Sequence, residues 1–211
     1  MGKIVSILLF ISCFSFGQKA EFFSDSKTVI KPGKYKINIT QRNNKTESVV
    51  SFDLFRKSGN KWSKIQNGSY KKPSDLPLSI ATDEDLNSDG YNDLKISYAQ
   101  AARGANEIEK LLIFNPKTQK LIEIINSQEY PNLHYNARRN CITSYMFYGG
   151  NATYFLHIKQ NKLEGFGKVE FSNDSIYSYK IKNKKEVLLK KQAYKSNDGA
   201  VFFSNFDPVE E

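Results

Sequence analysis

The sequence predicts an all-β protein, and three observations support this class. Short segments in which apolar and polar residues alternate recur along the chain. Clusters of Gly, Asn, Ser and Pro separate them, as turns between strands do. No segment sustains the 3.6-residue apolar spacing of an amphipathic helix. Roughly a dozen short strands would fit a propeller-like stack of small antiparallel sheets, a sandwich or an open barrel.

Residues 1–17 are predicted to be a secretory signal peptide. Lys3 supplies the positive start, residues 4–16 form an apolar run too short to span a membrane, and Gly17 is a plausible cleavage point. We therefore expect an exported protein, periplasmic or secreted, with no transmembrane segment. Lipid attachment at Cys13 is the alternative.

Residues 18–195 are expected to form a single all-β domain. Its first strands are predicted around 35–39 and 50–54, where alternate residues are apolar. A turn at Ser58-Gly59-Asn60 then connects to a strand over 61–65, which is a hairpin signal. A Pro-containing connector at 72–77 closes this part of the chain.

The second half of the chain continues the pattern, and Asn115-Pro116 marks one of its turns, because Pro presets φ for a bend. The tail 196–211 is expected to be loosely ordered, although Val201, Phe202 and Phe203 could dock. The further strands are predicted over 94–98, 108–114, 120–124, 142–148, 153–158, 163–171, 176–179 and 187–189.

The composition narrows the classes of function. The net charge of +9 is carried mainly by lysines spread along the chain, which suits solubility or an anionic partner. The lysine-rich run 180–185 lies where a strand and a turn are expected, which indicates a solvated edge. Export argues against a nucleic-acid partner. Once the signal peptide is removed, Cys141 is the one cysteine left, so no internal disulfide can form and a small core residue is its expected role.

Residues able to carry out catalysis are few. The histidines His134 and His157 have no ligand partners at suitable spacing, and no nucleophile elbow, P-loop or dinucleotide motif is present. Glu107 and Glu109 share a face of a predicted strand, and a solvated face is a simpler interpretation than a glycosidase pair. We therefore expect no enzyme, and a hydrolase with an unrecognised site remains an alternative.

The strongest motif is D-x-N-x-D-G-x-x-D over 85–93. Calcium binds six to eight oxygen ligands, and a tight loop can supply them from alternate residues. Gly90 permits the sharp turn, whereas Ile96 stands where an EF-hand has its Glu. The sequence predicts a calcium loop that leads into a strand; an Asx-rich turn without metal is the alternative. The expected ligands are Asp85, Asn87, Asp89, Asp93 and the carbonyl of Tyr91.

Aromatic and arginine residues near turns are candidates for contact with a partner. A rigid aromatic side chain on a hairpin gives a large contact area at a low cost in entropy, and arginines can meet acidic groups. Alternate aromatic residues of these strands are expected in the core instead. The candidate contact residues are Arg103, Arg138, Arg139, Tyr145, Phe147 and Tyr148.

Residues 78–171 resemble known proteins. The 85–93 loop resembles that of integrin-type FG-GAP repeats. It is still more similar to a bacterial periplasmic family known for immunity proteins against peptidoglycan-cleaving effectors of secretion systems. There the loop is followed by a strand, a Gly-containing segment, a strand ending in N-P-x-T and a returning strand. In this chain these are 94–98, Gly104, 111–118 and 120–124.

This resemblance implies a propeller-like all-β fold, structural calcium and inhibition by plugging an enzyme's active site. It assigns no inhibitory residue. We therefore expect a non-enzymatic, exported, calcium-binding β protein that acts by protein contact, with a peptidoglycan hydrolase as the expected target. A binding module for anionic glycans or envelope polymers is the main alternative.

Overall fold

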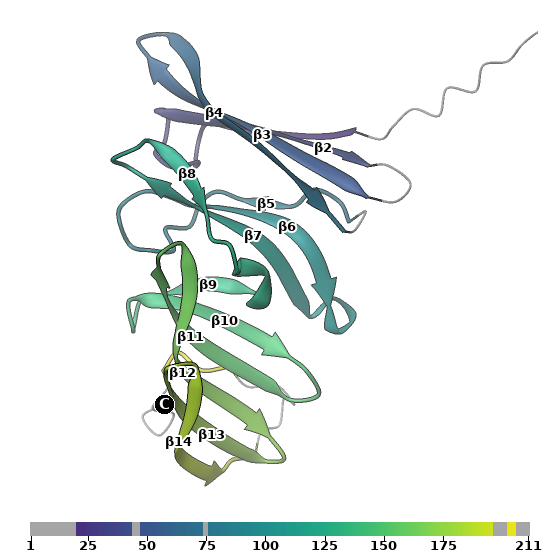
Figure 1. Ribbon diagram of the computed structural model, residues 1–211, viewed down its shortest axis with the longest axis vertical. Coiled ribbons are helices and arrows are strands. Elements are labelled where there is room, and N and C mark those ends of the chain that lie inside the picture. The colour runs from purple at the N-terminus through teal and green to yellow at the C-terminus, as the bar shows by residue number, and fades with distance from the viewer. Residues whose placement is uncertain (1–19, 44–46, 74–75, 196–201, 206–211) are drawn as a thin grey trace, which may run out of the picture.

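The structure is a computed structural model that describes residues 20–43, 47–73, 76–195 and 202–205. The predicted signal peptide and the lipidation site at Cys13 lie outside these residues. Within these ranges fourteen strands form three antiparallel sheets, and each sheet takes its strands consecutively from the sequence (Figure 1). Among the described residues, no helix is both long and apolar enough to cross a membrane.

The first sheet is a four-stranded meander. Its strands are β1 (Ala20–Asp25), β2 (Tyr35–Asn43), β3 (Ser48–Ser58) and β4 (Lys61–Lys72). Alternate residues of β2 and β3 are buried, which is the pattern of strands with one face on a core. The predicted hairpin is confirmed, because Ser58 pairs with Lys61 across a two-residue turn.

The second sheet lies in the middle of the molecule. Its strands are β5 (Ile80–Ala81), β6 (Leu94–Ala101), β7 (Asn106–Asn115) and β8 (Lys120–Glu123). Four consecutive residues of β7, from Leu111 to Phe114, are buried. Leu112 and Phe114 pack toward the first sheet, whereas Leu111 and Ile113 pack toward the third. The unbroken apolar run of β7 therefore reflects a strand covered on both faces.

The third sheet has six strands in chain order, and β14 lies at its outer edge. Its strands are β9 (Leu133–Asn136), β10 (Cys141–Phe147), β11 (Asn151–Lys159), β12 (Lys162–Ser172), β13 (Ser175–Lys182) and β14 (Lys185–Ala193). The face turned away from the second sheet carries a third core cluster, which includes Phe155 and Val169. Phe203 is 3% exposed within this cluster, whereas residues 196–201 and 206–211 of the tail that was expected to be loosely ordered lie outside the described residues.

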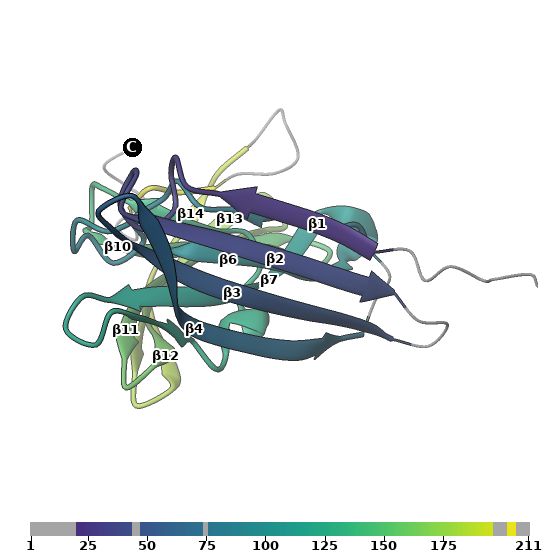
Figure 2. The same cartoon turned by 90° about the horizontal axis from the view of Figure 1, so that it is seen from above.

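The three sheets are stacked as layers, which Figures 1 and 2 show from two directions. One core lies between the first and second sheets, and another between the second and third. The all-β prediction is thus confirmed. Among the described strands none of the sheets is closed into a barrel, and the layers fit a sandwich better than the propeller-like arrangement.

Cys141 is buried in the third cluster, as expected for a small core residue. Burial raises the pKa of its thiol to about 11, so the thiol is protonated at neutral pH.

Candidate calcium loop and its surroundings

The predicted calcium loop connects β5 to β6 and contacts both inter-sheet cores. Leu86 is 1% exposed and belongs to the core between the second and third sheets. Tyr91 packs against the core between the first and second sheets, with its ring centroid 5.3 Å from that of Phe114. The loop therefore lies where all three sheets meet.

Backbone amides orient the side-chain oxygens at the start of the loop. Asp85 accepts hydrogen bonds from the N–H groups of Asp89 and Gly90, at 3.1 and 2.7 Å. Asn87 Oδ1 accepts a second bond from Asp89 N, and Asp89 Oδ1 accepts one from Tyr91 N. Gly90 has a φ of +86°, a conformation that favours glycine. These bonds form a network of Asx turns that draws the oxygens of alternate residues into one loop.

Asp93 is buried and connects the loop to the middle sheet. It is 2% exposed, and its carboxylate accepts bonds from Leu86 N at 2.9 Å and Phe114 N at 3.0 Å. Burial, aided by the charges of Asp89 and Asp85 and opposed by the two backbone hydrogen bonds, raises the pKa of Asp93 to about 7. The three carboxylates thus lie close enough to repel one another, and a cation between them would relieve that repulsion.

The donors of the loop fit a hard cation in type. Carboxylate, amide and carbonyl oxygens are the ligands that calcium prefers. The described part of the chain holds no group of three or more His, Cys, Asp or Glu side chains arranged to hold a metal. Asp85, Asn87, Asp89, Asp93 and the Tyr91 carbonyl would hold the ion, and the carboxylate oxygens of Asp85 and Asp93 accept backbone amides in this structure. Calcium binding therefore stays a prediction.

The connector between β1 and β2 holds the loop from the side of the first sheet. Asn92 N donates to Ile30 O at 2.9 Å, and its side chain donates to Thr28 O at 2.8 Å. Ile30 is buried with a φ of +58°, which a β-branched residue rarely adopts. Such a conformation costs about 1–3 kcal/mol and persists only where its surroundings impose it. Asp25 fixes the same connector by accepting the N–H groups of three successive residues, 27–29.

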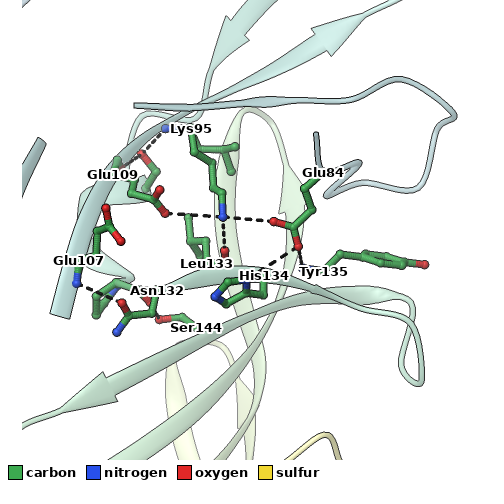
Figure 3. A network of polar contacts seen from close by, with 12 residues as sticks. Glu84, Lys95, Glu107, Glu109, Asn132, Leu133, His134, Tyr135 and Ser144 are labelled. Atoms are coloured by element: carbon green, nitrogen blue, oxygen red, sulfur yellow. Dashed lines mark hydrogen bonds and ion pairs between the residues drawn. The ribbon is translucent and has the colours of Figure 1, made fainter. Parts of the chain in front are cut away.

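A buried ion network begins directly after the loop (Figure 3). Lys95 on β6 donates to the carbonyl of Leu133 on β9 at 2.7 Å. Its Nζ also lies 3.1 Å from Glu84 and 3.8 Å from Glu109. Glu84 in turn accepts the backbone N–H of Tyr135 at 2.6 Å. One ammonium group therefore ties the entrance of the loop to the second and third sheets.

Glu109 corrects the expectation of a solvated strand face. It is 8% exposed, and burial raises its pKa to about 7, although the Lys95 charge acts in the opposite direction. Glu107 is partly exposed, and its backbone N–H donates to the side chain of Asn132. The two carboxyl groups therefore have different environments, and Glu109 is paired inside the protein.

Both histidines have structural contacts. The His134 ring lies 5.9 Å from that of Tyr145, and burial lowers the His134 pKa. His157 stacks on Phe166 with ring centroids 4.3 Å apart. These contacts agree with the structural role expected from the sequence.

Four of the predicted contact residues bind the chain's own C-terminal segment, residues 202–205. Tyr145 and Phe147 pack against the ring of Phe202, at 4.6 and 5.0 Å between centroids. Arg138 donates to Ser204 and Arg139 to the side chain of Asn205. The sequence could not show that these side chains meet a segment about sixty residues further along.

The other two predicted contact residues lie on the surface. Arg103 is exposed in the 3₁₀ turn Ala102–Gly104, and Tyr148 is 49% exposed beside the Gly149 turn. They are on different hairpins, and no described contact brings them together.

The edge strand β14 carries a surface that the sequence analysis missed. Three consecutive residues, Val187, Leu188 and Leu189, are 53%, 52% and 49% exposed. Runs of exposed aliphatic residues are unusual on monomeric proteins and mark contact surfaces. The signal was present in the sequence as an unbroken apolar triplet between the charged residues Glu186 and Lys190.

Comparisons with known proteins bear on the fold. No family model matches this chain, and no curated protein is found to match it. Among solved structures, one described as a Xanthomonas type IV secretion system related protein is similar, with a TM-score of 0.54 and 9% sequence identity. The match covers 80% of this chain and 93% of that one. At this identity the similarity shows a shared fold and no more.

Proposed function

We propose that this protein is exported and acts by binding another protein through its strand surfaces, with a calcium ion holding its central loop. The observation that carries the proposal is the edge strand β14, where three consecutive aliphatic side chains are about half exposed. Burying such side chains in a contact is favourable by roughly 25 cal/mol per Å² of apolar surface. A protein partner is the natural source of a matching apolar surface.

Calcium would serve this function by stiffening the scaffold. The 85–93 loop reaches the first sheet through Asn92, the second through Asp93, and the core next to the third through Leu86. An ion on the loop would neutralise its carboxylates and so fix the point at which the three layers join.

The proposed target is an enzyme that degrades the peptidoglycan of the cell envelope, and binding would inhibit it. The resemblance of residues 78–171 to periplasmic immunity proteins supports this choice. The net charge of +9 favours an acidic target, because complementary charge speeds association and excludes basic partners.

Affinity capture tests the proposal directly. The purified chain is incubated with envelope extract from the organism that encodes it, with and without a calcium chelator. We expect a peptidoglycan hydrolase to co-purify in calcium, and its lysis of cell-wall suspensions to fall when this protein is added. Turnover of peptidoglycan, polysaccharide or ester substrates by the protein alone would contradict the proposal, as would undiminished lysis in its presence.

The calcium loop gives a separate prediction. At about one hundred times its Kd, a ligand adds about 2.7 kcal/mol of stability, which for a chain of this size raises Tm by roughly 5–10 °C. We expect calcium to raise the Tm of the wild type and to leave Asp89→Ala unchanged, because this substitution removes one proposed ligand. Differential scanning calorimetry with and without calcium measures both shifts.

The matched control is Asp53→Ala, which removes a carboxylate from a surface ion pair with Lys64. It should keep the whole calcium-dependent shift. Equal shifts in the wild type and in Asp89→Ala would show that the loop is an Asx turn without metal.

A further inference from the structure

We propose that the outer edge of β14 accepts an acidic, extended segment of the partner protein as an added strand. This inference rests on the proposed function and specifies how and with what chemistry the partner binds. An added strand gains affinity from main-chain hydrogen bonds, and alternate side chains give it specificity.

The edge is open along most of its length. β14 is the last strand of its sheet and pairs with β13 alone among the described strands. Seven consecutive residues, from Lys185 to Lys191, are exposed. An edge strand presents a row of N–H and C=O groups that can pair with another chain. The described part of the molecule places no strand, loop or helix against this row.

Apolar side chains extend from this edge onto the sheet. Leu188 pairs with Tyr179, and Tyr179 pairs in turn with Lys168 and then Tyr154, so these four share one face. Leu189 is an extra residue, because Lys190 is the next to pair, with Ser178. A bulge at this point re-aims neighbouring side chains. The partner strand would therefore meet an aliphatic edge that continues into a tyrosine-lined surface.

The positive charge of the hairpin formed by β13 and β14 favours an acidic occupant. Between Ser175 and Lys195 the chain holds seven lysines and a single acidic residue, Glu186. The Glu186 carboxylate lies 2.6 Å from Lys168 Nζ and forms an ion pair with it within the same sheet. The lysines of β14 therefore present a positive field to an incoming strand, and this field is screened beyond roughly 8 Å at physiological salt.

Two other interpretations of the edge fit less well. Lysines on an edge strand often prevent strands from pairing, but such protection does not explain three adjacent half-exposed aliphatic residues. A second copy of this chain would bring two lysine-rich hairpins together, and like charges that face one another across strands are destabilising. An added acidic strand would cover the exposed aliphatic residues and would also pair its charges with the lysines of β14.

The test uses the full chain and a synthetic peptide as long as β14, nine residues, in which glutamate and valine alternate. Its binding is measured by fluorescence polarisation at low and physiological salt. Two further probes are the same peptide with N-methyl groups on alternate amides, and one with lysine in place of glutamate. The protein variants are Lys185→Glu/Lys190→Glu and a control with the same change of charge on other sheets, Lys61→Glu/Lys117→Glu.

We expect the acidic peptide to bind the wild type and the control variant alike, and the β14 variant about tenfold more weakly. The N-methylated and lysine peptides should not bind. Three results would overturn the inference and show a general polyanion surface. They are equal weakening in both variants, equal binding of the N-methylated peptide, and full competition by a sulfated polysaccharide. Concentration-dependent dimerisation that the β14 variant abolishes would assign the edge to a second copy instead.

The partner found by affinity capture separates this inference from the proposed function. If that protein binds Lys185→Glu/Lys190→Glu as tightly as the wild type, the proposed function stands and the assignment to β14 falls. If no protein binds the wild type, the proposed function itself fails.

Discussion

Replacing Lys95 with methionine is expected to destabilise the protein by about 3–5 kcal/mol at pH 8, because removal of one partner leaves buried charges uncompensated. The Lys95 side chain is 8% exposed and lies near two carboxylates, of which Glu109 is 11% exposed and Glu84 28%. Methionine fills a similar volume and carries no charge, so the loss measures the ion network and not a cavity. Urea unfolding at pH 8 measures the change in the free energy of unfolding.

The destabilisation caused by Lys95→Met should be smaller at pH 5 than at pH 8. The folded-state pKa of Glu109 is raised to about 7 from its ordinary value of 4.5, so the folded protein binds this proton more tightly than the unfolded chain. The resulting stabilisation is complete below about pH 4.5 and is lost as the pH rises through about 7. At pH 5 a protonated Glu109 no longer needs a cation beside it. Glu109→Gln, which resembles the protonated acid, should flatten the pH dependence of the Lys95→Met effect.

Lys64→Met is the control for Lys95→Met. It removes a surface ion pair with Asp53 whose side chains are 51% and 37% exposed, and it should cost about 0–1 kcal/mol. A loss in Lys95→Met no larger than in this control would mean that the buried network adds nothing to the joint between the second and third sheets.

Phe114→Ala should cost about 3–5 kcal/mol, because it leaves a cavity in a core that can relax only partly. Phe114 is 1% exposed, and its ring meets that of Tyr35 edge-on at 5.0 Å and that of Tyr91 at 5.3 Å. The substitution therefore loosens the first sheet, the middle sheet and the calcium loop together. Denaturant unfolding at fixed calcium measures the change.

Phe22→Ala is the matched substitution on the surface. Phe22 is 67% exposed on β1, so its removal should change stability by less than about 0.5 kcal/mol. Comparable losses in the two variants would contradict the packing described for the first core.

The local parts of the fold could be predicted from the sequence, whereas the contacts between sheets could not. Alternation located β2 and β3, and Ser58-Gly59-Asn60 marked the hairpin of β3 and β4, because both signals depend on neighbouring residues. No strand was predicted over the residues of β9, since four residues give too short a pattern. β1 was missed as well.

The buried ion network shows why the surroundings of the site were harder to predict from the sequence than the strands were. Lys95 meets Glu109 fourteen residues away and the Leu133 carbonyl thirty-eight residues away, and no periodic pattern encodes such a meeting. Period-two spacing alone suggested that Glu107 and Glu109 would both be solvated. In the same way, the aromatic residues Tyr145 and Phe147 of β10 pack against Phe202, which the sequence places more than fifty residues later.

The position of the middle sheet between two others affects how the chain folds during synthesis. With apolar side chains on both faces of β7, it cannot be stable until both of its neighbours have formed. Synthesis proceeds from the N-terminus, so the first layer is complete before β7 appears, but the covering strands of the third layer emerge last. For that interval Leu111 and Ile113 lack the side chains of the third sheet that cover them, and the nascent chain is most vulnerable to aggregation just before its final third is released.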